Sequence, residues 1–171
     1  KVPGNTVLEN VEMYDNNIGM GLINLVSTLP LRGYNKINLL TVNDKEITNT
    51  ETHTVQVTVD QSNCDDNTLR VSLAWYDKEA LPGCVNCLIN HLDLTVIRNN
   101  DIFYPNGRNS PDTKNNAQKV IITNIQTNEV YTIKVHAQNL ASPSETYSLV
   151  VSGCFEVNNY QPIQDLTCST I

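Results

Sequence analysis

Two neighbouring stretches, residues 69–77 (LRVSLAWYD) and 88–97 (LINHLDLTVI), decide the fold. In both stretches apolar residues recur at every second position, from Leu69 to Trp75 and from Leu92 to Val96, which predicts strands with one buried face and one wet face. The apolar positions are Leu69, Val71, Leu73 and Trp75 in the first stretch and Leu92, Leu94 and Val96 in the second. The opposite face of the second stretch carries an imidazole and a carboxylate, those of His91 and Asp93. Trp75 is the only tryptophan, and we expect it to anchor a core between two sheets.

The rest of the chain repeats this strand signal. Val, Ile, Thr and Asn are abundant, whereas Ala and Glu, which favour helices, are scarce. Residues 52–60 (THTVQVTVD) alternate most clearly, with Val55, Val57 and Val59 on one face. Further short strands are predicted at residues 36–42, 45–48, 102–104, 120–125, 130–137 and 146–152, with a turn at Asn43-Asp44 between the first two. We therefore expect an all-β fold, an antiparallel β-sandwich or jelly roll of about eight strands.

Charge and hydropathy exclude several classes of partner. The formal net charge is -7 and Lys and Arg form no cluster, so neither nucleic acid nor an anionic membrane surface is an expected partner. No apolar run approaches the roughly 20 residues that a membrane-spanning helix needs. Five cysteines in a small β-rich chain suggest an extracellular or secretory-pathway compartment. With no signal peptide at Lys1, we expect the chain to begin within a longer protein or after processing.

Six short segments follow one another between Leu69 and Gly153, namely LRVSLAWYD, LINHLDLTV, YPNG, NNAQKVIITNI, YTIKVHAQNL and TYSLVVSG. This succession resembles the β-sandwich that follows the catalytic domain in many subtilisin-like serine proteases. Near the start of the chain, the run Gly19-x-Gly21-x-x-Asn24 resembles the end of the catalytic domain in the same family. The resemblance implies a non-catalytic C-terminal domain of a secreted subtilisin-like endopeptidase, which stabilises or positions the catalytic domain or its substrate.

The resemblance also divides the chain into three parts. Residues 1–30 are expected to be the tail of a subtilisin-like catalytic domain, where apolar residues at helical spacing predict a short helix closed by Pro30. Residues 31–154 are expected to form the β-sandwich, and residues 155–171 a C-terminal tail with little periodicity. The expected partner is the subtilisin-like catalytic domain of the same polypeptide.

No catalytic triad is expected within this chain. Subtilisin-like proteases combine Asp, His and Ser, and the Ser lies in a Gly-Thr-Ser-Met-Ala type of motif that this sequence lacks. Gly-x-Ser-x-Gly is also missing. Of the three histidines, His53 and His136 occupy alternating positions in predicted strands, which favours ordinary places on a sheet face. Any proteolysis is therefore expected to be carried out by the preceding domain.

Calcium is the cofactor that the resemblance implies, because subtilisin-like relatives carry it in this domain. Ca²⁺ takes about six to eight oxygen ligands, and the candidate ligands here are Asp77, Asp93, Asp112, Asn115 and Asn116. However, His91 stands where the family pattern Asn-Asp-Leu-Asp-Leu has its first Asp, and imidazole is a poor ligand for this hard cation. In the alternative interpretation, the same side chains cap turns and bind loop backbone.

The cysteines allow several pairings. The candidate disulfide residues are Cys64, Cys84, Cys87, Cys154 and Cys168. Cys154 and Cys168 bracket the C-terminal tail and are candidates to hold it down, while Cys84 or Cys87 is a candidate partner for Cys64. The odd number leaves one thiol free or bonded outside this chain. Cys84-x-x-Cys87 could also contribute to a zinc site with Cys64 and His91, or act as a redox pair. Because a second close pair and a βαβ setting are missing, a structural disulfide is favoured.

The alternative function is a free-standing extracellular module that binds carbohydrate or protein. Side chains that could stack against a sugar are those of Tyr76, Phe103, Tyr104 and Tyr160. Aromatic residues make up only 6% of the chain, however, and form no evident stripe. The reading frame before Lys1 separates the two functions, because it encodes either a catalytic triad or a membrane anchor or adhesion repeat.

Overall fold

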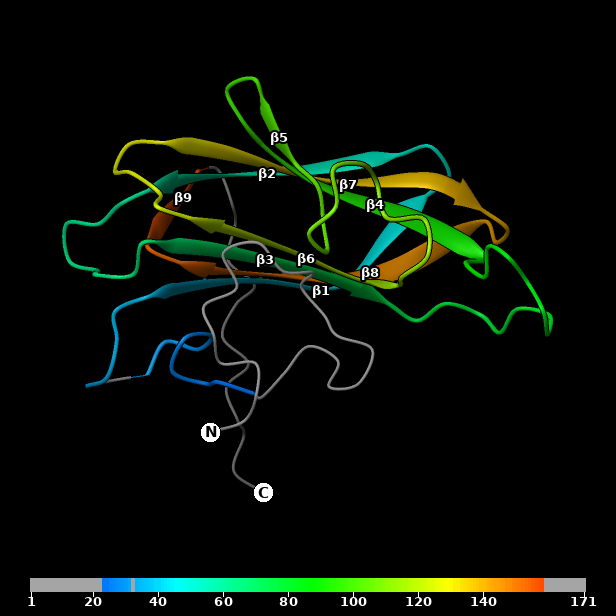
Figure 1. The fold of residues 1–171 in the computed structure, drawn as a ribbon, viewed down its shortest axis with the longest axis horizontal. Helices are drawn as coiled ribbons and strands as arrows, with labels where there is room; N and C mark the ends of the chain where they lie inside the picture. Colours follow the sequence, from blue (N-terminus) through cyan, green and yellow to red (C-terminus); the bar gives the residue numbers. More distant parts are fainter. Residues whose placement is uncertain (1–22, 32, 159–171) are drawn as a thin grey trace.

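The computed structural model describes residues 23–31 and 33–158. Within these ranges the chain forms strands and no helix, and the strands lie in two layers (Figure 1). The strands are β1 (Asn38–Thr48), β2 (Thr52–Val59), β3 (Thr68–Trp75), β4 (Asn90–Arg98), β5 (Asp101–Phe103), β6 (Ala117–Thr123), β7 (Val130–Leu140), β8 (Ser144–Gly153) and β9 (Phe155–Asn158). The all-β sandwich predicted from the sequence is confirmed.

The strand order is that of a jelly roll. One sheet has the order β1-β8-β3-β6 and the other has the order β5-β4-β7-β2-β9, and every pair is antiparallel. The nested pairs β1·β8, β2·β7, β3·β6 and β4·β5 are those of one long hairpin that is rolled into two layers. The additional strand β9 lies at the free edge of β2.

Alternating residues from both sheets form one apolar core. All seven apolar positions that alternate in β3 and β4 are at most 5% exposed. Trp75 ends this face, and its indole Nε1 donates a hydrogen bond to the backbone oxygen of Asn90 at 2.9 Å. Because a buried N–H without a partner costs about 1–3 kcal/mol, this bond allows the indole to lie between the layers. The predicted burial of Trp75 in the core is confirmed.

Residues 38–48 form one strand, whereas the sequence predicted two strands separated by a turn at Asn43-Asp44. β1 pairs with β8 along this whole length, and a β-bulge shifts the register between Val42 and Lys45. Asp44 has a φ of 49°, in the left-handed region that Asp tolerates better than most residues. Asn43-Asp44 therefore marks a β-bulge within β1 and not a turn between two strands. The neighbouring strand β8 pairs with β1 on both sides of this bulge.

The segment before β1 also differs from the prediction. Residues 25–29 form a hydrogen-bonded turn, in which the backbone N–H of Leu29 donates to the backbone oxygen of Leu25 at 2.8 Å. The helix predicted to end at Pro30 is therefore not formed by the residues described here, and the part of that prediction on residues 16–22 lies outside them.

At the other end, the sandwich extends past the predicted boundary at residue 154. Phe155, which was expected to begin a tail, begins β9 and is 1% exposed in the core. Gly153 makes the step from β8 to β9 with a φ of 150°. A Cβ at this position would lie 2.8 Å from the backbone oxygen of Thr68, so only glycine fits without a shift.

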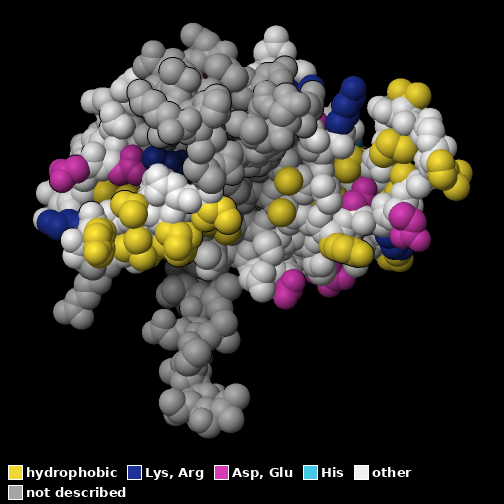
Figure 2. All heavy atoms as spheres, turned by 60° about the horizontal axis from the view of Figure 1, so that its bottom comes forward, with side chains coloured by type: hydrophobic (Ala, Val, Ile, Leu, Met, Phe, Trp, Pro, Cys, Tyr) yellow, Lys and Arg dark blue, Asp and Glu magenta, His cyan; other side chains and the backbone are white. Residues whose placement is uncertain are grey.

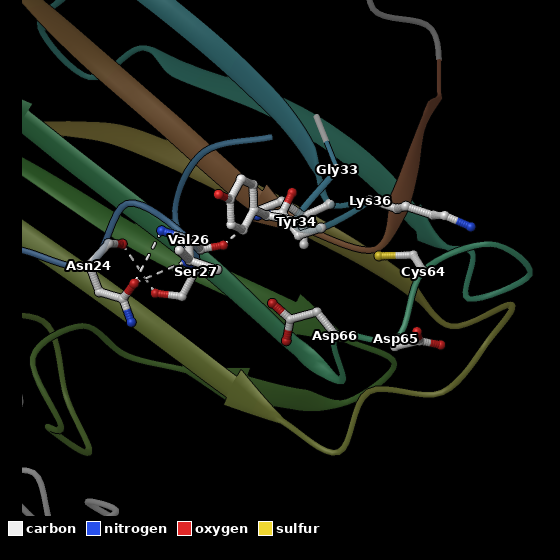
Figure 3. Close-up of a pocket in the computed structure, with 11 residues that line it drawn as sticks. Asn24, Val26, Ser27, Gly33, Tyr34, Lys36, Cys64, Asp65 and Asp66 are labelled. Carbon is white, nitrogen blue, oxygen red and sulfur yellow. Dashed lines mark hydrogen bonds between the residues drawn. The ribbon is translucent and has the colours of Figure 1, made fainter. Parts of the chain in front are cut away.

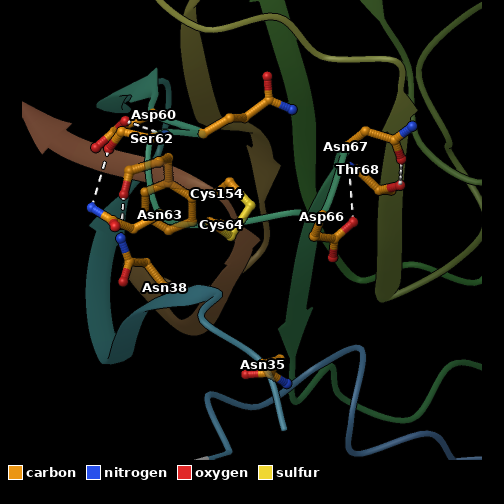
Figure 4. Close-up of a disulfide and its surroundings, with 12 residues drawn as sticks. Asn35, Asn38, Asp60, Ser62, Asn63, Cys64, Asp66, Asn67, Thr68 and Cys154 are labelled. Atoms are coloured by element: carbon orange, nitrogen blue, oxygen red, sulfur yellow. Dashed lines mark hydrogen bonds between the residues drawn. A yellow bond between two sulfur atoms is a disulfide. The ribbon is translucent and has the colours of Figure 1, made fainter. Parts of the chain in front are cut away.

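A disulfide between Cys64 and Cys154 joins the loop after β2 to the junction of β8 and β9 (Figure 4). The two cysteines are 7% and 0% exposed and form a small buried cluster with Ile37. This pairing corrects both of the pairings suggested for these cysteines, because Cys154 is not bonded to Cys168 and Cys64 is not bonded to the loop that carries Cys84 and Cys87. β9 explains the difference, since it brings Cys154 beside the end of β2.

Candidate functional site

The predicted calcium ligands cluster around one edge of the sandwich, where β4 of one sheet faces β6 of the other. The connection from β5 to β6 passes here from one layer to the other (Figure 1). We call residues 104–116 the crossover loop. Asp112, Asn115 and Asn116 belong to this loop, Asp93 lies on β4, and Asp77 follows β3.

Asp112 is the centre of the crossover loop. Its buried carboxylate accepts hydrogen bonds from Asn106 Nδ2 at 2.6 Å, Asn115 Nδ2 at 2.7 Å and the Lys114 backbone N–H at 3.0 Å. Arg108 Nε lies 3.3 Å from the same carboxylate. Burial raises the pKa of Asp112, but these donors and the Arg108 charge outweigh burial and leave the pKa below its ordinary value. Asp112 is therefore an ionised carboxylate whose acceptor sites are used within the loop.

The Gln118 side chain makes hydrogen bonds to the backbone at the edge of β4, as a neighbouring strand would. β5 pairs only with Val96–Arg98, so among the described strands none covers the earlier part of this edge. Gln118 is 1% exposed, and its Oε1 accepts the backbone N–H of Leu94 at 2.8 Å. Its Nε2 donates to the backbone oxygens of Leu92 and Asp112, each at 3.0 Å. One side-chain amide thus provides hydrogen-bond partners for backbone groups at the β4 edge and connects the crossover loop to that edge.

His91 lies between the two carboxylates of this edge. Its Nε2 is 2.9 Å from Asp93 Oδ1, and the two side chains are 18% and 12% exposed. The hydrogen bond with Asp93 raises the pKa of His91, and burial opposes this shift. A hydrogen bond with the Asp112 backbone and the Asp112 charge add to the rise, so the pKa lies above its ordinary value. Its carboxylate neighbours therefore favour the protonated form of the His91 imidazole.

Asp77 fixes the base of the loop between β3 and β4. Its Oδ2 accepts the backbone N–H of Ile89 at 2.8 Å. Its Oδ1 accepts the backbone N–H groups of Asn90 at 2.8 Å and Lys78 at 3.0 Å. Asn116 binds the same strand end, because its Nδ2 donates to the backbone oxygen of Trp75 at 3.0 Å.

Each of the five predicted calcium ligands makes a contact within the protein. The oxygens of Asp77 and Asp112 accept N–H donors, and Asp93 is paired with His91. Asn115 and Asn116 use their amide groups to bind Asp112 and Trp75. Within residues 23–31 and 33–158, no group of three or more His, Cys, Asp or Glu side chains is placed to hold a metal ion. Asp77, Asp112 and Asn116 bind backbone groups, as the alternative interpretation expects. Asp93 and Asn115 instead bind the side chains of His91 and Asp112.

Two buried amides on the strands of this region were missed by the sequence analysis, namely Gln118 on β6 and Asn90 on β4. Asn90 is 0% exposed, and its Oδ1 accepts the backbone N–H groups of Ala141 and Ser142 at 2.9 and 3.2 Å. Its Nδ2 donates to Glu145 Oε2 at 2.6 Å. Each amide lies two residues before an inward apolar residue and shares its face. A polar residue in phase with buried apolar neighbours is therefore the signal that could have identified both.

The remaining two bonded cysteines pair with each other, as Cys84–Cys87, in the exposed loop between β3 and β4. The disulfide favoured for this motif is therefore present. A zinc site with Cys64 is excluded, because the Cys64 sulfur is bonded to Cys154.

The other two histidines, His53 and His136, form hydrogen bonds with Glu51, Tyr147 and Thr52, and none with a serine side chain is present among these contacts. His53 Nε2 is 2.9 Å from Glu51 Oε1, and its Nδ1 is 2.8 Å from the Tyr147 hydroxyl. His136 Nδ1 is 2.8 Å from Thr52 Oγ1. These pairs connect neighbouring strands and the two sheets.

The three predicted sugar-stacking residues that the structure describes, Tyr76, Phe103 and Tyr104, do not form one platform. Phe103 packs beside Tyr131, with ring centroids 6.5 Å apart, and the guanidinium carbon of Arg98 lies 5.6 Å from its ring centroid. Tyr104 is half-buried, whereas Tyr76 is 89% exposed on the loop between β3 and β4. Tyr160 lies outside the described residues.

An apolar surface lies on the segment before β1. We call residues 23–31 and 33–37 the N-terminal turn, and its exposed apolar side chains are Ile23 (89%), Leu25 (53%), Val26 (49%) and Tyr34 (80%). Figure 2 shows hydrophobic side chains gathered over this part of the surface, apart from a second group at the other end of the molecule.

Polar groups of the N-terminal turn are satisfied within it. Asn24 Oδ1 accepts the backbone N–H of Val26 at 3.1 Å, and Asn35 Oδ1 accepts that of Leu31 at 3.0 Å. Asn35 Nδ2 also donates to the backbone oxygens of Val26 and Leu29. Between this turn and the loop after β2 lies a hollow of about 490 Å³, with Tyr34 and Asp66 in its wall (Figure 3).

A scan of the sequence against protein-family models and a search of curated proteins both find no match. No helix among the described residues is long and apolar enough to cross a membrane. The two disulfides indicate an oxidising setting.

Proposed function

We propose that this chain is the non-catalytic C-terminal β-sandwich of a secreted subtilisin-like serine endopeptidase, and that the N-terminal turn contacts the catalytic domain. The order of the six segments between Leu69 and Gly153 supports this proposal, as do the jelly-roll strand order and the two disulfides. The domain would stabilise the catalytic domain or hold it and its substrate in place.

The exposed apolar face of the N-terminal turn carries the proposal. Its backbone groups are bonded to Asn24 and Asn35, so covering the turn removes apolar surface from water without stripping those groups of partners. Each Å² of apolar surface covered is worth about 25 cal/mol, and interfaces between domains of one chain bury about 600–1,500 Å². The turn immediately precedes β1, which is where a preceding domain would connect.

The reading frame before Lys1 is the first test. An Asp, His and Ser triad encoded there supports the proposal. A membrane anchor or a series of adhesion repeats would instead support the free-standing module.

The second test uses the complete polypeptide and two matched double variants. Leu25→Ser with Tyr34→Ser removes apolar contacts from the N-terminal turn, and we expect it to shorten the half-life of peptidase activity at elevated temperature several-fold. Leu81→Ser with Val85→Ser also replaces two exposed apolar side chains by serine, at positions that are 83% and 89% exposed on the loop between β3 and β4. Equal half-lives for the two variants would contradict a contact through the N-terminal turn.

A second candidate is a module that binds another protein through the loop between β3 and β4. Tyr76, Leu81 and Val85 on this loop are each at least 83% exposed, which is unusual for apolar side chains so close in sequence. This candidate requires an upstream frame without a peptidase.

A further inference from the structure

We propose that the Cys84–Cys87 disulfide is a thiol-exchange site, at which a small thiolate opens the bond while the sandwich and its buried disulfide stay intact. The proposal is independent of the proposed function, because it depends only on the loop between β3 and β4. Nothing in the sequence motif alone separates an inert disulfide from an exchangeable one.

The first argument is access to the sulfur atoms. An attacking thiolate must reach one sulfur of the bond, so the exchange rate depends on exposure. All seven residues 81–87, which include both cysteines, are exposed. The sulfurs of the other disulfide belong to residues that are only 7% and 0% exposed, at Cys64 and Cys154. Under native conditions a thiolate can therefore reach Cys84–Cys87 without any opening of the fold.

The second argument is that the fold does not hold this disulfide closed. Cys84 and Cys87 are 3 residues apart, whereas Cys64 and Cys154 are 90 residues apart. In the chain-entropy treatment, the stabilising free energy grows with the logarithm of loop length. The corresponding equilibrium constant grows with the 3/2 power of the length, which favours the long loop by about 100-fold. Because a disulfide that stabilises the folded state is in turn stabilised by folding, folding protects Cys64–Cys154 against reduction by this additional factor. Folding gives Cys84–Cys87 little such protection.

The third argument is that the loop is separated from the core at its base. Both carboxylate oxygens of Asp77 bind the backbone N–H groups of Ile89 and Asn90, at 2.8 Å each. Asn90 in turn accepts the indole N–H of Trp75. Opening the disulfide therefore alters only the loop conformation between Asp77 and Ile89. The environment of Trp75 should stay unchanged.

The reaction balances with a thiol as the co-reactant. A thiolate attacks one sulfur, the S–S bond breaks, and the other cysteine leaves as a thiolate that takes up a proton. The product is a mixed disulfide between the protein and the small thiol. A second thiolate then attacks this mixed disulfide, which yields two protein thiols and the oxidised form of the reductant, with two electrons transferred.

The test is differential alkylation of the chain under native conditions. The chain is incubated with graded dithiothreitol, or in a second arm with glutathione, then quenched with N-ethylmaleimide, and each cysteine peptide is quantified by mass spectrometry. We expect Cys84 and Cys87 to become labelled at a dithiothreitol concentration at least tenfold below that required for Cys64 and Cys154. Glutathione should add to Cys84 or Cys87, and Trp75 fluorescence should not change.

Two variants complete the test. Cys168→Ser removes the fifth cysteine and should leave this order of labelling unchanged, and the unsubstituted chain gives the same information if that variant does not fold. Cys84→Ser with Cys87→Ser should show no labelling in the low range and the same Trp75 fluorescence. Reduction of both disulfides at one dithiothreitol concentration, or labelling of Cys84 and Cys87 only when the fluorescence reports unfolding, would overturn the proposal.

Discussion

Replacing Gln118 by Leu tests whether the edge of β4 depends on one side chain. Leucine is similar in size but has no amide, so the backbone N–H of Leu94 and the backbone oxygens of Leu92 and Asp112 lose a hydrogen-bond partner. The contacts with Leu92 and Leu94 lie at the buried edge of β4 that β5 does not reach. The change therefore removes polar contacts with little change in volume.

The expected loss of stability follows from these contacts. Each buried backbone group left without a partner costs about 1–3 kcal/mol, so three groups cost several kcal/mol. Burying a leucine in place of an amide returns about 1–3 kcal/mol. We expect a net decrease in the free energy of unfolding of about 3 kcal/mol, which corresponds to a decrease in Tm on the order of 10 °C for a domain of this size.

The assay combines urea unfolding, followed by Trp75 fluorescence, with hydrogen exchange of the native protein. Exchange should become faster at the Leu94 amide and in the crossover loop, and stay unchanged in β1. The matched control is Gln56→Leu, an exposed position on β2 whose Nε2 donates to Thr132 Oγ1 at 3.1 Å, and it should alter stability by about 0.5 kcal/mol or less. Equal effects of the two substitutions, or a loss of stability without faster exchange at Leu94, would refute the reasoning.

Three further predictions concern a disulfide, a glycine and a histidine. Replacing Cys64 and Cys154 together by Ala should lower the free energy of unfolding by about 2–5 kcal/mol in urea titrations without reductant, because the bond spans 90 residues. Gly153→Ala should cost about 2 kcal/mol or more, since its Cβ would lie 2.8 Å from a backbone oxygen. Calorimetry should show a larger decrease in Tm for Gly153→Ala than for Gly83→Ala, whose Cβ meets nothing within 4 Å. The pKa of His91 is raised above 6.5 by its carboxylate partners, so the stability it contributes is complete below about pH 6.5 and is lost as the pH rises through the folded-state pKa. The difference in stability between the unsubstituted protein and His91→Asn should therefore shrink from about pH 6 to pH 9, and a difference that grows would contradict this sign.

The sequence was informative where a strand has one covered face. β3 and β4 alternate clearly because one side of each meets the core and the other meets water. The same signal failed around Asn43-Asp44, where polar residues mark a bulge that depends on the partner strand. It also failed before Pro30, since apolar residues at helical spacing do not fold into a helix without a surface that covers them. In the described residues, Leu25 and Val26 face solvent.

The carboxylates of the candidate site could be predicted, but their partners could not. Asp77 and Asp112 were identified as carboxylates at loop positions, and such a carboxylate can hold a cation or bind N–H groups. The choice depends on which donors the fold brings near, and for Asp77 these are amides that lie 12 and 13 residues further along the chain. Local sequence gives no information on contacts of that kind.

The incorrect disulfide assignment has one physical origin, which is the short strand β9. Four residues are too few for an alternating pattern to stand out from a tail, so Cys154 was expected to face the chain that follows it. Once β9 is recognised as a neighbour of β2, the pairing follows from the register. Val59 lies opposite Phe155, and the backbone N–H of Asp60 donates to the Cys154 oxygen at 3.2 Å. Cys64 follows in the loop after β2, and its sulfur is bonded to that of Cys154. The buried disulfide is therefore a consequence of strand pairing, and a variant that prevents β9 from pairing should also slow formation of this bond during oxidative refolding.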